Sequence, residues 1–382
     1  MKLRDYHIIK QSQAREVVQR AMRNQRTAHA YLLHGPEGTG KEALALFLAQ
    51  NFLCGRRHAQ APGADLFGEV RPPDSACGEC SSCKRIAELS HPDLHVVFPR
   101  AASATEQERT EVLRSFAAQP FQRSRPWENA SILIDDVRAL KRALSVSSYE
   151  GHGSVVLLLE ANRLKAESAN ALLKILEEPP AERYFILTST SLASLLPTIV
   201  SRCQAVAVAP LSRVEIADFL QQHHQVESGR ATFLATVANG NLRYAHALLE
   251  EDLEARRKLA VEYLRMAFKF NKPLEQMEFL QRLVHENDRH ELQQLLRFCM
   301  LWIRDAYVLK SCGAEPEFEQ FVVNTDFREA LLELIKNLPQ FDFERVLEEI
   351  DYAIMCLERY VQPTLVLMVL LHRIRRLARS GR

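Results

Sequence analysis

A glycine-rich loop near the start of the chain constrains the fold most, because such a loop works only between a strand and a helix. The loop spells His34-Gly35-Pro36-Glu37-Gly38-Thr39-Gly40-Lys41-Glu42. In the pattern G-x-x-x-x-G-K, backbone N–H groups curl around phosphate oxygens and the lysine brings a point charge to the outer phosphates. The flanking segments fit, because Ala30–Leu33 is predicted to be an apolar strand and Ala43–Phe52 a helix with its positive end towards the phosphates. The predicted nucleotide-binding residues of the loop are Gly35, Gly38, Thr39, Gly40, Lys41 and Glu42.

The loop departs from its pattern at its last position. A Ser or Thr hydroxyl normally follows the lysine and holds Mg²⁺, whereas this chain has Glu42. A carboxylate there lies close to phosphates that it repels. The sequence therefore predicts nucleotide binding that is weak, poor in metal or absent, and it leaves open a loop that is only a structural turn.

Composition indicates a soluble globular protein. The chain has 382 residues, 47% hydrophobic and 25% charged, which is enough for two or three domains. A net charge of +1 gives no whole-chain argument for nucleic-acid binding. The longest apolar run, Leu365–Leu371, is far shorter than the roughly 20 residues that cross a bilayer, and the first residues lack the apolar segment of a secretory signal. We therefore expect a cytoplasmic protein without a membrane partner, whose cysteines are thiols or metal ligands.

Strand and helix patterns alternate up to about residue 210. After the glycine loop and its helix, further strands are predicted at Ser131–Ile134, Val155–Leu159, Tyr184–Thr188 and Ala205–Val208. Helices are expected around 137–149 and at Ala166–Glu178, and the polar, proline-interrupted residues 101–129 are expected to be a surface excursion. This alternation predicts a parallel sheet covered on both faces.

Only helical patterns follow Pro210. We predict an α/β domain over 1–210, a small helical lid over 211–252 and an all-α domain over 253–382. The all-α domain ends in a basic tail at helical spacing, which suits either contact with DNA phosphates or a solvated helix end. The residues of this tail are His372, Arg373, Arg375, Arg376, Arg379 and Arg382.

Four cysteines within 30 residues lie on a segment rich in glycine, proline and polar residues. Cys54, Cys77, Cys80 and Cys83 give the spacing C-x22-C-x2-C-x2-C. Two-residue gaps let successive thiolates turn back onto one tetrahedral ion, and Zn²⁺ suits four sulfurs in a closed, structural site. Buried free thiols and an iron–sulfur cluster are the alternatives. The other cysteines lie on apolar or helical segments and are expected to be packing residues: Cys203, Cys299, Cys312 and Cys356.

A nucleotide hydrolase of this layout needs a strand-end acid for Mg²⁺, usually followed by a carboxylate that orients the attacking water. Two candidates compete in this chain. Asp135 and Asp136 follow three aliphatic residues, whereas Glu160 ends a longer buried strand and is followed by Ala161, which cannot polarise water. Sequence order favours Glu160, because a helix over Ser168–Glu178 follows it directly.

Further motifs closely resemble the bacterial clamp-loader subunits of the AAA+ class. They are Asn170-Ala171-Leu172-Leu173-Lys174-Ile175-Leu176-Glu177-Glu178-Pro179-Pro180 and Ser201-Arg202-Cys203. His91-Pro92-Asp93-Leu94, and Ile134-Asp135 before a Val-Arg-x-Leu helix, are more similar to the delta-prime branch of DNA polymerase III than to the ATP-hydrolysing branch. In that family the acid-bearing strand comes just before the Asn-Ala-Leu-Leu helix. The resemblance thus implies that Glu160 takes the metal-acid position and Ala161 that of the catalytic carboxylate.

The resemblance also assigns roles to single residues. Arg202 matches an arginine at the subunit edge that reaches the γ-phosphate held by a neighbour, where a guanidinium neutralises charge developing during phosphoryl transfer. Arg243, in Gly240-Asn241-Leu242-Arg243, resembles the second-sensor arginine that touches bound nucleotide. Thr188 or Thr190 is the candidate for the first sensor. The residues alone allow plain surface arginines and an ordinary strand-end threonine.

With Glu42 and Ala161 both out of pattern, the resemblance implies a non-hydrolysing stator subunit of the DNA polymerase III clamp loader. Such a subunit joins sibling subunits in a ring through its all-α collar domain, helps to load the sliding clamp on primed DNA, and presents Arg202 to a neighbour's ATP. ATP or ADP is expected to bind weakly or not at all, and Zn²⁺ to be structural. Two alternatives stay open, an ATP-hydrolysing motor subunit of the same complex and an architectural adaptor with neither nucleotide nor finger.

Overall fold

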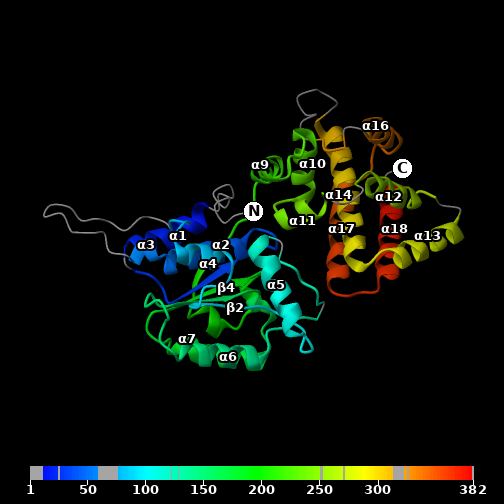
Figure 1. Ribbon diagram of the computed structural model, residues 1–382. Coiled ribbons are helices and arrows are strands. Elements are labelled where there is room, and N and C mark those ends of the chain that lie inside the picture. Colours follow the sequence, from blue (N-terminus) through cyan, green and yellow to red (C-terminus); the bar gives the residue numbers. More distant parts are fainter. Residues whose placement is uncertain are drawn as a thin grey trace. The chain divides into compact units, whose positions relative to one another are not determined.

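Two compact units, Met1–His246 and Ala247–Arg382, make up the chain in the computed structural model (Figure 1). The structure describes residues 12–24, 26–58, 76–121, 123–127, 129–249, 253–269, 272–312, 322–324 and 327–380. The N-terminal residues considered for a signal, and residues 59–75 of the predicted zinc module, lie outside this description. The predicted division into three domains, at 210 and 252, remains a prediction.

A parallel sheet forms the centre of the first unit, with the strand order β2-β3-β4-β1-β5. The strands are β1 (Ala30–His34), β2 (Leu94–Val97), β3 (Ser154–Leu158), β4 (Arg183–Ser189) and β5 (Gln204–Ala207). β1, which leads into the glycine loop, pairs with β4 on one side and β5 on the other. Because parallel strands end at one edge of a sheet, the residues that follow β1, β3 and β4 come together there.

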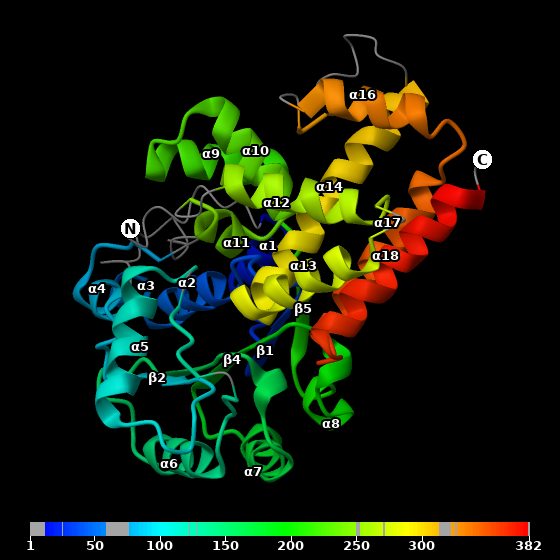
Figure 2. The ribbon, with the colours of Figure 1, turned by 90° about the vertical axis from the view of Figure 1, so that its right-hand side faces the viewer.

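Helices cover both faces of the sheet (Figures 1 and 2). The first face carries α1 (Ser12–Arg23), α2 (Lys41–Leu53) and α4 (Ser81–Ala87), and the other carries α6 (Ile134–Leu144) and α7 (Ala166–Glu177). α2 is buried along almost its whole length, because it packs on the sheet and against α4. The predicted architecture is confirmed: a parallel-sheet domain with a cysteine cluster, followed by helical segments.

The predicted strand Ser131–Ile134 is wrong. Its first residues form only isolated bridges, and α6 begins at Ile134. The Asp136 carboxylate accepts a hydrogen bond from the Leu133 N–H at 3.2 Å, so it caps a helix where the aliphatic run suggested a strand. The second strand in chain order is instead β2, which sequence analysis missed.

The surface excursion expected over 101–129 is only partly correct. Thr105 caps α5 (Glu106–Ala118), because its hydroxyl accepts from the Glu108 N–H at 3.2 Å. The chain then returns to the glycine loop, where the Arg123 side chain is only 2% exposed. A polar composition therefore did not mean a solvent-exposed segment here.

Three further helices of the first unit follow the sheet. They are α9 (Arg213–His224), α10 (Ser228–Ala238) and α11 (Leu242–Ala247), hereafter the lid helices. α11 reaches the boundary between the two units. α9 and α10 pack on each other, and α11 brings Arg243 towards the glycine loop.

The described residues of the second unit are helical and contain no strand. Their elements are α12 (Leu253–Met266), α13 (Pro273–Glu286), α14 (Arg289–Cys312), α16 (Arg328–Asn337), α17 (Phe343–Glu358) and α18 (Pro363–Ser380). In the predicted basic tail, Arg373 pairs with Glu349 of α17, and the side chains of Arg379 and Arg382 lie outside the description. Across the described parts of the chain, no helix is both long and apolar enough to cross a membrane.

Candidate functional site

The glycine loop joins β1 to α2 and is held by the lid helices. Gly38 and Gly40 have φ values of 71° and 81°, in the left-handed region that favours glycine. A Cβ on Gly38 would lie 1.7 Å from the Asn241 Oδ1, and the Gly38 carbonyl accepts from the Leu242 N–H at 2.9 Å. The left-handed backbone and the close approach of the Asn241 side chain therefore both favour a glycine at position 38, independently of any phosphate.

Lys41 is turned back onto its own loop. Its Nζ donates to the carbonyls of Gly35, at 2.7 Å, and Pro36, and lies 3.4 Å from the Thr39 Oγ1. The lysine is 7% exposed, and burial lowers its pKa to about 8 against the opposing effect of nearby carboxylates. Lys41, Gly35 and Thr39 thus stabilise the conformation of the loop itself.

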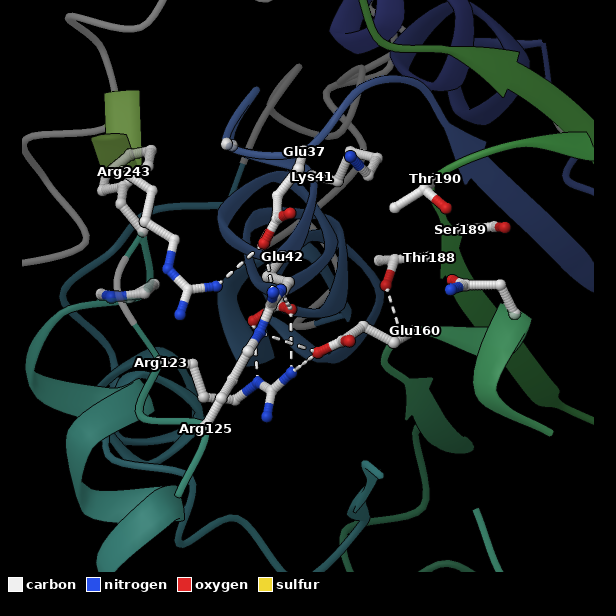
Figure 3. A pocket seen from close by; sticks show the side chains of 15 residues that line it. Glu37, Lys41, Glu42, Arg123, Arg125, Glu160, Thr188, Ser189, Thr190 and Arg243 are labelled. Carbon is white, nitrogen blue, oxygen red and sulfur yellow. Dashed lines mark hydrogen bonds and ion pairs between the residues drawn. The ribbon is translucent and has the colours of Figure 1, made fainter. Parts of the chain in front are cut away.

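Glu42 has a cationic partner, Arg123 (Figure 3). Nε and Nη2 of Arg123 donate to the two carboxylate oxygens of Glu42 at 3.0 and 3.2 Å, and Nη2 also contacts Glu160. Burial raises the pKa of Glu42, but the charge and hydrogen bonds of Arg123 lower it by more, so this pKa lies below its ordinary value. One guanidinium therefore bridges the position after the loop lysine and the strand-end acid.

A second group of ion pairs links this cluster to the lid helices (Figure 3). Arg125 pairs with Glu37 and, at 3.0 Å, with Glu160. Arg243 of α11 pairs with the same Glu37 at 3.1 Å. Burial raises the pKa of Glu37, and the two arginines together lower it by more. Each carboxylate among the described residues that line the cavity therefore has an arginine partner.

The cavity between these side chains has a volume of about 40 Å³. A single water needs roughly 10–15 Å³, so only a few waters fit. Pockets for small ligands have about 300–1,000 Å³, so a nucleotide does not fit this arrangement. Of the residues predicted to bind nucleotide or act as sensors, those that line the cavity are Gly38, Gly40, Lys41, Glu42, Glu160, Thr188, Thr190 and Arg243.

The residues around Glu160 differ in whether they have polar side-chain atoms that face the cavity. Thr188, near the end of β4, is buried, and its Oγ1 accepts from the Glu160 N–H at 2.9 Å. Ala161 is buried and has no polar side-chain atom. The competing acid, Asp135, is 78% exposed, and neither it nor Asp136 lines the cavity. The structure thus brings Glu160, and not the aspartate pair, to the glycine loop.

Arg202 does not line this cavity. It lies between α8 (Pro197–Val200) and β5, an edge strand of which only one residue is buried. Its guanidinium donates to the Glu177 carboxylate at 2.7 Å and to the Thr198 carbonyl at 3.0 Å. The arginine side chain is 34% exposed and that of Glu177 47%. A half-exposed ion pair at a sheet edge can exchange its carboxylate for an external anion, because exposed pairs are weak.

The four cysteines predicted to bind a metal lie together beyond the other end of α2. The Cys54 Sγ is 3.7 Å from that of Cys77 and 4.0 Å from that of Cys80, and Cys77 and Cys83 are 4.0 Å apart. All four sulfurs lie within 4.8 Å of one another. Sulfurs bound at about 2.3 Å around a tetrahedral ion lie about 3.8 Å apart, so this cluster fits a metal ion.

Backbone and α2 contacts fix the cysteine cluster. The N–H groups of Cys77, Cys80 and Cys83 donate to cysteine sulfurs at 3.3–3.5 Å. Gln50, on α2, donates to the Cys83 carbonyl at 2.9 Å, and Cys54 directly follows the last residue of the helix. One buried helix therefore positions both candidate sites, the glycine loop at its start and the sulfur cluster at its end.

The His91-Pro92-Asp93 motif joins the cysteine cluster to the loop before β3. The His91 Nδ1 accepts from the Asp93 N–H at 3.1 Å, which leaves Nε2 to donate to Glu150 at 3.1 Å. The same carboxylate binds Ser82 and Arg85 of α4. The motif therefore packs two segments together and does not line the glycine-loop cavity.

Arg123 and Arg125 are site residues that no sequence motif predicted. They are 81 and 88 positions from Glu42 and Glu37, on a segment without a recognisable motif. The available signal was Glu42 itself, because a buried carboxylate in a loop of this kind calls for a cationic partner. The sequence does not show which of 49 lysines and arginines supplies it.

Several curated relatives of this chain are subunits of DNA polymerase III. A family model described as DNA polymerase III, delta subunit, matches residues 10–212. The DNA polymerase III subunit delta' of Bacillus subtilis is 31% identical over 255 residues, 66% of this chain and 64% of that protein. The delta' subunit of Pseudomonas aeruginosa is 36% identical over 176 residues, 46% of this chain and 42% of its own.

A more distant match covers more of the chain. The DNA polymerase III subunit tau of Bacillus subtilis is 25% identical over 345 residues, which is 84% of this chain and 53% of that subunit. In each of these relatives the match spans less than two thirds of the relative's length.

Proposed function

The chain belongs to the delta-prime family of DNA polymerase III subunits, and we propose that it is a non-hydrolysing stator of that polymerase's clamp loader. In this role it joins sibling subunits in a ring in the cytoplasm, through its helical C-terminal unit. It helps to place the sliding clamp on primed DNA, and it presents Arg202 to ATP bound by a neighbouring subunit.

One observation carries the non-hydrolysing part of this proposal. Glu37, Glu42 and Glu160, the carboxylates of the described cavity lining, are all bound by arginines. Hydrolysis needs a carboxylate or amide that orients water and an open metal position. Ala161 supplies no such group, and the Mg²⁺ hydroxyl is replaced by Glu42.

The position of Arg202 supports a role in trans. Its guanidinium does not reach the chain's own cavity and is held by a half-exposed carboxylate beside an edge strand. A planar guanidinium suits the developing charge of a transferring phosphoryl group, and such a finger is worth about 10³–10⁵ in rate.

We further assign Zn²⁺ to the four-cysteine cluster. Four sulfurs leave no open coordination position, so the ion would stabilise the fold and take no part in chemistry. The mutual distances of the sulfurs, 3.7–4.0 Å for the closest pairs, support this assignment.

The test is ATP hydrolysis by the loader reconstituted with its sibling subunits, sliding clamp and primed DNA. Arg202→Ala is expected to lower hydrolysis at the neighbouring site by about 10³-fold or more, and Arg202→Lys should not restore it, because a lysine lacks the planar fork. The chain alone should hydrolyse no ATP above background.

Arg109→Ala is the matched control, because Arg109 is 36% exposed and also pairs with a single carboxylate, that of Glu106. It should leave hydrolysis unchanged. Wild-type rates with Arg202→Ala would make Arg202 a structural residue and remove the finger. Turnover by the chain alone would make it a motor subunit.

A further inference from the structure

The guanidinium of Arg123 lies where a P-loop enzyme holds its metal ion. In such enzymes Mg²⁺ lies between the residue after the loop lysine and the acid of a neighbouring strand. Here these two positions are Glu42 and Glu160, and Arg123 contacts both carboxylates. An acid at position 42 is unsuited to phosphate but well suited to a guanidinium, whose planar fork binds a carboxylate with two donors.

The surrounding charges are nearly balanced without a ligand. Glu37, Glu42 and Glu160 face Lys41, Arg123, Arg125 and Arg243, that is, three negative groups and four positive ones, for a net charge of +1. The positive electrostatic potential that remains is therefore too weak to attract a polyphosphate strongly. The side chains of Arg123, Glu42 and Glu160 are 2%, 15% and 13% exposed, so the pairing among these three residues is largely buried.

The same segment also contacts the lid. The ring of Phe121 packs edge-on against Phe219 of α9, with ring centres 5.7 Å apart. A Cβ on Gly40 would meet that Phe121 ring at 3.2 Å. Glu37 of the loop joins Arg125 to Arg243 of α11. Phe121, Arg123 and Arg125 therefore connect the glycine loop with Glu160, the acid that follows β3, and with the lid helices.

We propose that Phe121, Arg123 and Arg125 act as a built-in ligand of the glycine-loop cavity, with the Arg123 guanidinium in place of the metal ion. They stabilise the lid helices against the loop as a bound nucleotide and its Mg²⁺ would, and they exclude that nucleotide. The lid position is thus set by the chain's own side chains and is independent of nucleotide. This proposal concerns the chain's own cavity and does not depend on Arg202.

Two measurements on the full-length chain test it: calorimetric titration with Mg²⁺-ADP, and amide hydrogen exchange of α9 and α11. Wild type should give no binding heat and exchange rates that Mg²⁺-ADP does not change. Arg123→Met should speed amide exchange in the two lid helices by at least about tenfold. The reason is that it removes the guanidinium that joins Glu42 of the loop to Glu160 after β3. Arg109→Met, at an arginine 36% exposed, is the matched control and should exchange like wild type.

The double variant Glu42→Thr/Arg123→Met keeps the test valid if Arg123→Met alone does not fold. It restores a hydroxyl at position 42, and Glu160 keeps Arg125 as its partner at 3.0 Å. It should bind Mg²⁺-ADP and, once bound, exchange more slowly in α9 and α11. The proposal is overturned if wild type binds Mg²⁺-ADP as tightly as the double variant. It is equally overturned if neither variant changes lid exchange.

Discussion

The two ends of α2 carry two sites that differ in how complete they are without a ligand. At its end, four cysteine sulfurs lie within 4.8 Å of one another, at distances that suit a tetrahedral ion. At its start, the carboxylates and cations of the glycine-loop cavity already bind one another. The first site has the geometry to bind an external cation, whereas the carboxylates of the second are already paired with arginines of the same chain.

A ligand-binding motif and a ligand-binding site are therefore separate things. Both segments keep a backbone shape that a ligand requires. In the glycine loop that shape is stabilised by Lys41 and by contacts with Asn241 and Leu242 of the lid. Contacts within the chain therefore fix the shape of the loop without any ligand.

Removing a cysteine should give the largest effect and tests the first half of the comparison. Cys80→Ser should lose the bound metal and lower the melting temperature of the first unit, because structural Zn²⁺ contributes about 10–16 kcal/mol of apparent binding energy in small zinc domains. Metal content and thermal unfolding measure this. Cys312→Ser, at an exposed cysteine of the second unit, is the control. Full metal content in Cys80→Ser would mean that the cluster does not bind metal through this sulfur.

Breaking the buried network should give the next largest effect. Arg123→Met leaves two carboxylates close together without their shared cation, and removing one partner of a buried pair typically costs about 3–5 kcal/mol. Urea unfolding of the first unit measures it. Adding Glu42→Thr should recover much of the loss, because it removes the carboxylate that has lost its two-donor partner and leaves Glu160 paired with Arg125. A loss below about 0.5 kcal/mol in Arg123→Met would show that the pairing is weak.

The sequence predicted the cysteine cluster and the sheet better than the cavity, for a physical reason. The cysteines are close in sequence and their spacing itself encodes a metal geometry. The partner of Glu42 comes from 81 positions away, on a segment that looked like a surface excursion. The misassigned strand Ser131–Ile134 shows the same limit, because a single cap from Asp136 decided between strand and helix.

Lowering the pH should reduce the stability of the wild-type chain more than that of a variant without the Glu42 carboxylate. The folded-state pKa of Glu42 is lowered from 4.5, so its contribution to stability is complete above about pH 4.5 and is lost as the pH falls through the lower folded value. Urea unfolding between about pH 6 and pH 3 should show a steeper loss for wild type than for Glu42→Gln. Parallel curves would show that Glu42 is not a paired carboxylate in the folded chain.

The smallest effect is expected at Asp135, the acid whose neighbouring residues match a metal-binding strand end better than those of Glu160 do. Asp135 follows an aliphatic run, as a metal-binding acid would, yet its side chain is 78% exposed and pairs with Arg138 of the same helix. Asp135→Asn should change the stability of the first unit by less than about 0.5 kcal/mol, because exposed i,i+3 pairs are weak. It should also leave hydrolysis by the reconstituted loader unchanged. A clear loss of stability or of hydrolysis would show that a second acid near the sheet contributes to the function of this unit. It would contradict the contrast between a self-contained cavity and a metal-binding cluster.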